Sequence, residues 1–131
     1  FKHRPYTDPE QFRRGDHIPV MDGRHVFKMA TTSMVDVARS VMQRNGVAPG
    51  DLRLVLMHQA NKRINEYCAK ALSLREDQVP HNIHKYGNTT AATIPLLWDE
   101  CVRDGRLRPG DLVLMVAFGA GMTWGASLVR A

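Results

Sequence analysis

Hydrophobic residues recur at helical spacing in three stretches of the chain. The first stretch, from Val26 to about Arg44, is stopped by Pro49-Gly50. A second helix is expected from about Asn61 to Leu72, and a third from about Thr90 to Arg103, with Pro95 in its first turns, where a missing N–H is tolerated. The apolar faces of the three helices consist of Ala30, Met34, Val37, Ala38 and Val41; of Ile64, Tyr67, Cys68, Ala71 and Leu72; and of Ile94, Leu97, Trp98, Cys101 and Val102.

Apolar runs between and after these helices predict strands. Leu52 to Met57 is short and largely apolar, as the strands of a buried parallel sheet are. Leu112 to Phe118 and Met122 to Val129 predict two more strands, joined by the tight Gly119-Ala120-Gly121 turn. A short extended piece is expected from Val79 to Lys85. The alternation of helices with apolar strands indicates an α/β fold.

The sequence Pro-Gly-Asp-Leu occurs at 49–52 and again at 109–112, and each copy follows a helix and opens a strand. The first of these strands ends at His58 and the second at Phe118-Gly119. If the two strands are parallel neighbours, His58 and the glycine turn lie at the same edge of the sheet, where ligands of open α/β sheets bind. Pro-Gly-Asp turns also join helices to strands where no site exists, so the repeat alone favours the structural explanation.

The beginning of the chain differs from the rest. Residues 1–25 hold three prolines and many charges without a clean period, so we interpret them as an extended N-terminal segment and residues 26–131 as the folded domain. A chain of 131 residues suits one domain with a single core. We see no apolar run near the roughly 18 residues of a membrane span, and no stretch that resembles a secretory signal.

The composition is that of a globular protein, with 44% hydrophobic and 24% charged residues. Cys68 and Cys101 fall on apolar helix faces and are too few for a disulfide framework, which favours the reducing cytoplasm. The net charge of +5 favours acidic partners, such as nucleic acid, an acidic carrier protein or the phosphates of coenzyme A. Nucleic acid fits poorly because the basic residues are scattered and no aromatic platform or binding motif stands out. The histidines do not pair with the cysteines at zinc-finger spacing, so no metal site is expected.

Three segments carry groups that could act in chemistry or could only stabilise the fold. His58 follows a strand and could serve as a base, a donor or a metal ligand, or it could be a structural histidine beside a helix capped by Asn61. Asn88 could cap a helix, or it could offer its amide to a developing negative charge. The turn at Ala120 could be a simple hairpin, or it could aim a backbone N–H at an oxyanion. Taken singly, His58 and Asn88 fit the structural roles better.

The order of these segments is more specific than any one of them. His58-Gln59-Ala60-Asn61, then Tyr86-Gly87-Asn88-Thr89, then Phe118-Gly119-Ala120-Gly121-Met122-Thr123-Trp124-Gly125 resemble the type III β-ketoacyl-acyl carrier protein synthases. The resemblance extends upstream through Met21-Asp22-Gly23-Arg24-His25-Val26-Phe27-Lys28 and covers nearly the whole chain from about Ile18. That family has the thiolase fold, a duplication of two α/β halves. The resemblance implies that this chain is the second, thiolase-like half, with helices packed on a mostly parallel mixed sheet.

The resemblance also implies a reaction and its residues. The family condenses an acyl group from acyl-CoA with malonyl-acyl carrier protein in fatty acid biosynthesis, with these substrates and no cofactor. His58 and Asn88 match the catalytic histidine and asparagine, which stabilise the enolate that decarboxylation forms. The backbone N–H at Ala120 matches an oxyanion-hole donor, although glycine is frequent there. Neither Cys68 nor Cys101 matches the nucleophile, which is expected in a first half absent from this sequence, so this chain alone is expected to be inactive.

Binding residues follow from the same resemblance. The positions that match the lining of the pantetheine tunnel are Met21, Gly23, Phe27 and Asn61. Arg63 matches a basic residue that docks the acidic carrier protein, and Lys62 beside it would add to the positive rim. A solvated helix face explains Lys62 and Arg63 nearly as well. The implied partners are acyl carrier protein, acyl-CoA, the N-terminal half of the enzyme and a second copy in a homodimer.

Two other functions stay open. An acyltransferase or condensing enzyme of secondary metabolism with the same fold would differ mainly in its primer pocket, and little of that pocket lies in this chain. A non-catalytic carrier-docking subunit would bind pantetheine without chemistry. The presence of both His58 and Asn88 speaks against such a subunit, because docking alone does not need an enolate-stabilising pair.

Overall fold

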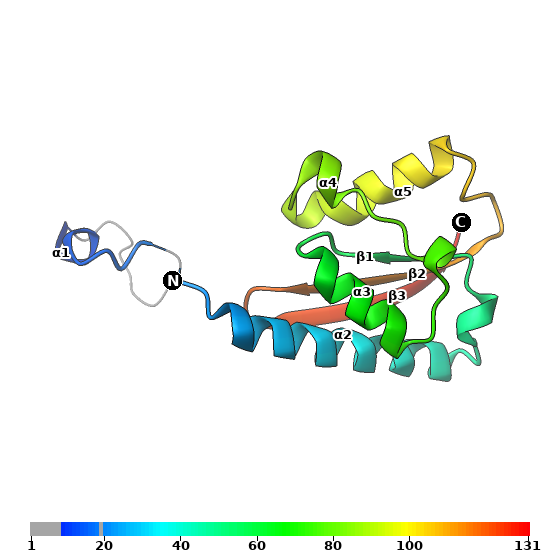
Figure 1. Ribbon diagram of the computed structural model, residues 1–131, viewed down its shortest axis with the longest axis horizontal. Helices are drawn as coiled ribbons and strands as arrows, with labels where there is room; N and C mark the ends of the chain where they lie inside the picture. Colours follow the sequence, from blue (N-terminus) through cyan, green and yellow to red (C-terminus); the bar gives the residue numbers. More distant parts are fainter. Residues whose placement is uncertain (1–8, 19) are drawn as a thin grey trace.

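The fold is a three-stranded sheet between two layers of helices (Figure 1), seen in a computed structural model that describes residues 9–18 and 20–131. The strands are β1 (Leu54–Met57), β2 (Leu112–Gly119) and β3 (Thr123–Arg130), in the spatial order β1-β2-β3. The pairing of β1 with β2 is parallel, and that of β2 with β3 is antiparallel. The sheet is therefore mixed, as expected for this α/β fold.

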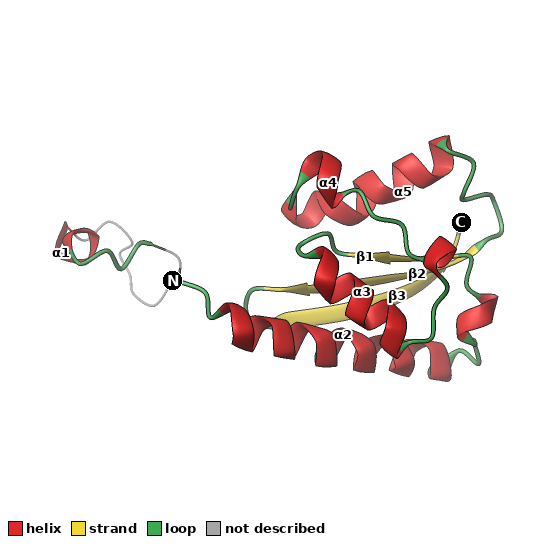
Figure 2. Ribbon diagram, in the orientation of Figure 1, coloured by secondary structure: helices red, strands yellow, loops and turns green. Residues whose placement is uncertain are grey.

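Helices cover both faces of the sheet (Figure 2). The helices α2 (Gly23–Arg44) and α3 (Lys62–Ala71) pack on one face, and α5 (Thr93–Arg103) packs on the other. Successive side chains of a strand point to opposite faces: Val55, Met57, Leu114 and Val116 join the core under α2 and α3, whereas Leu54, Leu56 and Val113 join the core under α5. Because β1 and β2 are covered on both sides, their sequences are continuously apolar.

The two cysteines lie one in each core. Cys68 packs among the residues under α2 and α3, and Cys101 packs among those under α5. Both are free and buried, and burial raises the pKa of the Cys68 thiol to about 11. A thiol held protonated in this way is a poor nucleophile, which agrees with the structural role expected of both cysteines.

The predicted helices and strands are present, with shifted ends. α2 begins at Gly23 and not at Val26, because the Asp22 side chain accepts the backbone N–H groups of Arg24 and His25. β1 begins at Leu54 and not at Leu52, because Leu52 is the C-cap of the 3₁₀ turn η1 (Pro49–Asp51). The third predicted helix is α5 preceded by a 3₁₀ turn, η3 (Thr90–Ala92).

Two segments that were predicted to be extended contain helices. Part of the segment 1–25 forms α1 (Pro9–Arg13), in which Arg13 forms an ion pair with Glu10. This helix lies apart from the rest of the protein in Figure 1. Residues 1–8 and 19 of that segment lie outside the described residues, and the division into a segment and a domain stays a prediction. The second segment, Val79–Lys85, runs into the helical turn α4 (Ile83–Tyr86). A further 3₁₀ turn, η2 (Glu76–Gln78), precedes it.

The carboxyl ends of β1 and β2 meet at one edge of the sheet, as the sequence predicts for parallel neighbours. The backbone N–H of His58, directly after β1, donates to the carbonyl of Val116 in β2 at 2.9 Å. The turn that joins β2 to β3 leaves the sheet at the same edge. Both groups that the sequence singled out are therefore at the edge where ligands of such sheets bind.

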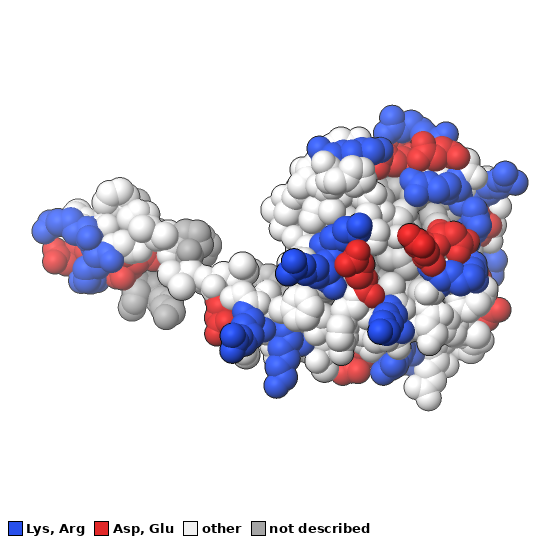
Figure 3. Space-filling view, in the orientation of Figure 1, with Lys and Arg blue, Asp and Glu red and all other residues white. Residues whose placement is uncertain are grey.

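The surface carries interspersed charges. On the face drawn in Figure 3, Lys and Arg lie among Asp and Glu. Some neighbours form ion pairs along one helix, such as Lys62 with Glu66 and Arg103 with Asp99. The net charge of +5 is therefore not gathered into one basic patch on this face. Within residues 9–18 and 20–131, no helix combines the length and apolar character that a membrane span needs.

Candidate active site

His58 is held by the strand before it and by the helix after it. Its carbonyl accepts a hydrogen bond from the Asn65 Nδ2 of α3 at 3.2 Å. Its ring is half-buried, and the ring Nδ1 lies 2.6 Å from the hydroxyl oxygen of Thr93, the first residue of α5. Burial lowers the pKa of the imidazole below its ordinary value. At neutral pH the ring is therefore uncharged and carries a single N–H donor.

Asn88 follows the end of α4, where Gly87 adopts φ 67° and ψ −155°, a conformation that is essentially reserved for glycine. The Asn88 side chain is exposed, and its Oδ1 accepts the backbone N–H of Thr90 at 3.0 Å. This contact closes a local turn and is not the helix N-cap that the sequence left open for Asn88, because Thr89 is the N-cap of η3. It uses only the carbonyl oxygen, and within the described residues the amide nitrogen Nδ2 makes no hydrogen bond.

Polar contacts through Thr90 and Thr93 connect Asn88 with His58. Asn88 accepts from the N–H of Thr90, and the carbonyl of Thr90 lies 3.1 Å from the Thr93 hydroxyl, which in turn contacts the His58 ring. Segments that are some thirty residues apart in sequence thus meet at the beginning of α5. This short turn region contacts one atom of each side chain and leaves one nitrogen of each without a hydrogen bond to any described residue.

Buried polar side chains support the loop that carries His58. Gln59 is 1% exposed, and its amide donates to the carbonyl of Met57 at 2.7 Å and accepts the N–H of Asn82 at 3.3 Å. Asn65, also 1% exposed, holds the His58 carbonyl. Because buried polar groups are stable only when hydrogen-bonded, these contacts fix the loop after β1 against the segment that leads to Asn88.

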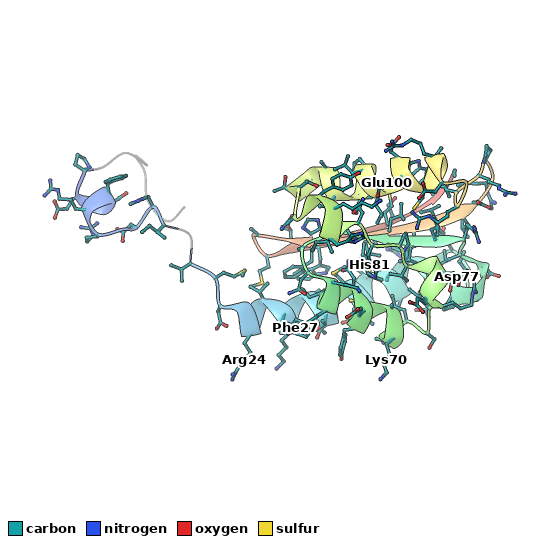
Figure 4. All side chains as sticks on the ribbon, turned by 45° about the horizontal axis from the view of Figure 1, so that its top comes forward. Arg24, Phe27, Lys70, Asp77, His81 and Glu100 are labelled. Carbon is teal, nitrogen blue, oxygen red and sulfur yellow. The ribbon has the colours of Figure 1, made fainter. Side chains whose placement is uncertain are left out.

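Glu100 anchors the segment before Asn88. Its carboxylate accepts hydrogen bonds from Asn82 Nδ2 at 2.8 Å, Lys85 Nζ at 2.9 Å and Tyr86 OH at 2.9 Å. Figure 4 shows Glu100 on α5, on the other side of the sheet from Phe27 of α2. The hydrogen bonds from Lys85 and then Asn82 lower the pKa of Glu100 to about 2, so the carboxylate is charged at neutral pH. The sequence analysis missed this residue, although an acid beside the core residues Leu97 and Cys101 was a usable signal.

The residues that match the pantetheine tunnel begin two neighbouring helices. Met21 is 73% exposed just before the cap of α2, and Gly23 is the first residue of that helix. Phe27 is partly buried, and its ring meets that of Tyr67 of α3 edge-on, with centroids 6.4 Å apart. Asn61 caps α3 by accepting the N–H of Arg63 at 3.0 Å, which confirms its predicted capping position. A binding role for these four residues stays a prediction.

The remaining predicted residues are exposed. Lys62 forms a surface ion pair with Glu66 at 3.5 Å, whereas the exposed guanidinium of Arg63 has no ion pair with any described residue. Ala120 lies in the β2–β3 turn, and its carbonyl accepts the Thr123 hydroxyl at 3.3 Å. The next residue must be glycine, because φ at Gly121 is 144° and an added Cβ would lie 2.8 Å from a Thr123 methyl group. Across the described part of the chain, no three His, Cys, Asp or Glu side chains cluster as metal ligands would.

Comparison with known proteins agrees with this fold. Residues 42–131 match the protein family described as "3-Oxoacyl-[acyl-carrier-protein (ACP)] synthase III C terminal". A β-ketoacyl-[acyl-carrier-protein] synthase III of Desulfotalea psychrophila is 47% identical over 116 residues, which are 88% of this chain and 36% of that protein. The protein of the same name from Aquifex aeolicus is 47% identical over 110 residues, which are 84% of this chain and 36% of that protein.

Solved structures show the same architecture. The crystal structure of 3-oxoacyl-[acyl-carrier-protein] synthase III from Aquifex aeolicus superposes with a TM-score of 0.84 at 46% identity, over 86% of this chain and 36% of that one. The priming β-ketosynthase of the R1128 polyketide pathway superposes with a TM-score of 0.77 at 36% identity, over 85% of this chain and 34% of that one. The expected thiolase-like fold is confirmed, and the chain spans 36% of the length of the curated relatives named above. This chain belongs to the 3-oxoacyl-[acyl-carrier-protein] synthase III C-terminal family.

Proposed function

We propose that this chain is the C-terminal half of an enzyme that condenses an acyl-CoA primer with malonyl-acyl carrier protein in fatty acid biosynthesis. The enzyme that joins this chain to a first half is called the two-half enzyme below. Family membership supports the fold and the class of reaction. The observation that carries the residue assignment is the pair of contacts, Asn88 with Thr90 and His58 with Thr93, that ties both side chains to one turn region with a nitrogen of each left unused.

The chemistry needs two stages. A cysteine thiolate of the first half attacks the acyl-CoA thioester, and coenzyme A leaves. The malonyl thioester then breaks the bond to its carboxylate carbon, carbon dioxide leaves, and the electron pair of that bond forms an enolate. The enolate carbon attacks the acyl-cysteine carbonyl, a new carbon–carbon bond forms, and the cysteine thiolate leaves. Neither Cys68 nor Cys101 is suited to the first stage, because both thiols are buried with raised pKa values.

His58 and Asn88 act in the second stage as donors to the enolate oxygen. A neutral imidazole and a carboxamide each offer an N–H to the developing negative charge without transferring a proton. One preorganised donor of this kind is typically worth about 3–4 kcal/mol of barrier height. The lowered pKa of His58 supports this role, because it keeps the ring neutral. A neutral ring can donate its N–H to the negative charge that exists only in the transition state and the intermediate. The N–H of Ala120 would serve the acyl-cysteine carbonyl in the same way.

The partners follow from the substrates. The pantetheine arm of coenzyme A or of the carrier protein would pass Met21, Gly23, Phe27 and Asn61. Arg63, exposed and without an ion pair among the described residues, would meet the acidic carrier protein, with Lys62 beside it. Such charges mainly increase the rate of encounter. A homodimer, a cytoplasmic location and a reaction without a cofactor complete the proposal.

The test is carbon dioxide release from malonyl-acyl carrier protein by the two-half enzyme. His58→Ala and Asn88→Ala should each lower the rate by about 100- to 1000-fold, the usual cost of removing one such donor. Asn88→Asp is the matched control for Asn88, since it keeps the size and the Oδ1 acceptor for Thr90 but removes the N–H donor, and it should fail like the alanine variant. His84→Ala is the matched control for His58, because His84 is an exposed histidine of α4 and its loss should leave the rate unchanged. Unchanged rates in the His58 and Asn88 variants would defeat the assignment.

The similarity to the priming β-ketosynthase of the R1128 polyketide pathway supports one alternative, a condensing enzyme of secondary metabolism. Both enzymes would use the same enolate-stabilising pair, so carbon dioxide release does not separate them. Turnover with a panel of acyl-CoA primers does, because the primer pocket is the part expected to differ.

A further inference from the structure

We propose that Thr93 sets the tautomer of the His58 ring, by donating its hydroxyl hydrogen to Nδ1 so that the ring hydrogen stays on Nε2. This inference rests on the proposed function, since it explains why the ring presents a donor and not a lone pair to the enolate. Thr93 is a positioning residue, because it acts through His58. The sequence analysis placed it only within the helix predicted from about Thr90.

The geometry around the Thr93 hydroxyl favours donation to the ring. Thr93 is 2% exposed, so its hydroxyl has to find its partners inside the protein. Two acceptors are near it: Nδ1 of His58 at 2.6 Å and the carbonyl of Thr90 at 3.1 Å. The hydroxyl has one hydrogen, and the closer acceptor is the ring nitrogen. A separation of 2.6 Å places the hydroxyl oxygen in close hydrogen-bond contact with the ring nitrogen.

The competing acceptor already has a donor. The carbonyl of Thr90 accepts the backbone N–H of Thr93 at the end of η3. It therefore stays hydrogen-bonded when the Thr93 hydroxyl points to the ring. The Nδ1 of His58, in contrast, has no other partner within the described residues. With donation to the ring, the Thr90 carbonyl and the ring Nδ1 are both hydrogen-bonded.

The ring then has its hydrogen on the opposite nitrogen. Burial lowers the pKa of His58, so the ring is neutral and has one N–H. With Nδ1 accepting, that N–H is at Nε2, which makes no hydrogen bond to any described residue. In the other tautomer, Nε2 would point a lone pair at the enolate oxygen and would repel it. Thr93 therefore decides whether the ring attracts or repels the charge that decarboxylation forms.

The same turn also engages the acceptor atom of Asn88. The N–H of Thr90 engages the Oδ1 acceptor of Asn88 and leaves the Nδ2 donor unused. The residues from Thr90 to Thr93 thus occupy the acceptor atom of each side chain, Oδ1 in one and Nδ1 in the other. What remains on both is a donor, which is what an enolate oxygen requires. This correspondence between two separate contacts is the strongest argument for the role of Thr93.

The test compares three forms of the two-half enzyme: wild type, Thr93→Ser and Thr93→Val. Serine keeps the hydroxyl, whereas valine keeps the branched shape and loses it. The tautomer is read from the ¹⁵N chemical shifts of the His58 ring, assigned by the loss of its signals in His58→Ala. We expect wild type and Thr93→Ser to hold hydrogen on Nε2, and Thr93→Val to show a mixture or hydrogen on Nδ1. Malonyl decarboxylation should fall by about ten- to a hundredfold in Thr93→Val, less than in His58→Ala, and recover in Thr93→Ser.

Hydrogen on Nδ1 in the wild type would overturn the proposal, and so would a Thr93→Val enzyme with unchanged tautomer and rate. If Thr93→Val does not fold, the wild-type spectrum and the Thr93→Ser enzyme still decide. The tautomer is measured without substrate, so it does not depend on the reaction. A wild-type enzyme with hydrogen on Nε2 but no malonyl decarboxylation would therefore refute the proposed function and leave the hydrogen bond from Thr93 in place.

Discussion

Two regions lie at the carboxyl edge of the sheet, the His58 and Asn88 region and the β2–β3 turn, and different contacts hold them in place. The loop of His58 and the segment before Asn88 are fastened by buried side chains, with Gln59, Asn65 and Glu100 all hydrogen-bonded. The β2–β3 turn at the same edge is exposed at Ala120 and Gly121. A side-chain donor needs neighbours that fix its rotamer and its tautomer, whereas a backbone donor is fixed by the course of the chain itself.

Directly after the β2–β3 turn, β3 exposes a large apolar side chain. Trp124 is 49% exposed, although its ring stacks on Phe118 with centroids 6.4 Å apart. The chain spans 36% of the length of the two curated relatives compared above, and the first half that we propose would supply cover for this turn. On this account the enolate donors are preorganised within this chain, whereas the oxyanion donor at Ala120 is completed by the other half.

Loss of Glu100 is the change expected to damage the fastened region most. Glu100→Ala leaves Asn82, Lys85 and Tyr86 without their acceptor and should destabilise the fold by about 2–3 kcal/mol. It should also lower malonyl decarboxylation, because the segment before Asn88 loses its anchor. Asp99→Ala is the matched control on the same helix, since Asp99 forms an exposed ion pair with Arg103 and no other ion pair with a described residue. Its loss should cost less than about 0.5 kcal/mol. Denaturant unfolding of both variants makes the comparison, and equal losses would show that Glu100 is not an anchor.

Acid should weaken the same contact. The pKa of Glu100 is lowered from 4.5 to about 2, first by the hydrogen bond from Lys85. A carboxylate with a lowered folded-state pKa stabilises the fold above its ordinary pKa and loses that effect as the pH falls toward the folded-state value. The stability difference between wild type and Glu100→Gln should therefore shrink as the pH falls from about 5 to 2. A difference that stays constant over this range would contradict the lowered pKa.

The next largest effect is expected at Gly87. Gly87→Ala should cost about 1–2 kcal/mol, because its φ of 67° with ψ of −155° is strained for any residue with a Cβ. Nothing lies within 4 Å of the added Cβ, so strain and not a clash is the cause. Gly50→Ala is the control, since Gly50 also has open space but no positive φ, and it should be nearly neutral. Thermal unfolding and the decarboxylation rate distinguish the two variants. The rate should fall only in Gly87→Ala, because only that change should displace Asn88.

The smallest effect is expected at Arg63, the exposed basic residue of α3 that we propose meets the carrier protein. Arg63→Ala should slow association of the two-half enzyme with acyl carrier protein several-fold at low salt, and the difference should shrink at high salt because exposed charges are screened. Lys70→Ala at the other end of α3 is the control and should change association little. Stopped-flow binding at two salt concentrations measures both. Equal effects of the two substitutions would leave Arg63 as one more residue of a solvated helix face.

Much of the fold could be predicted because its signals are local. The helices and strands followed from the apolar faces of α2, α3 and α5 and from the apolar runs of β1 and β2. The parallel pairing expected of β1 and β2 placed His58 at the same edge as the β2–β3 turn. The turn α4 was missed because two of its four residues, Lys85 and Tyr86, are held by Glu100 of α5, a contact that the local sequence does not reveal. Thr93 was missed for the same reason, since a threonine that begins a helix reveals its role only through a histidine 35 positions away.

The most direct test of the account is a structure of the two-half enzyme with a malonyl-pantetheine analogue that cannot lose carbon dioxide. The account predicts that Nε2 of His58 and Nδ2 of Asn88 both lie within about 3.2 Å of the analogue's thioester oxygen, while Thr93 still contacts Nδ1. An oxygen bound by only one of the two nitrogens, or by neither, would contradict it.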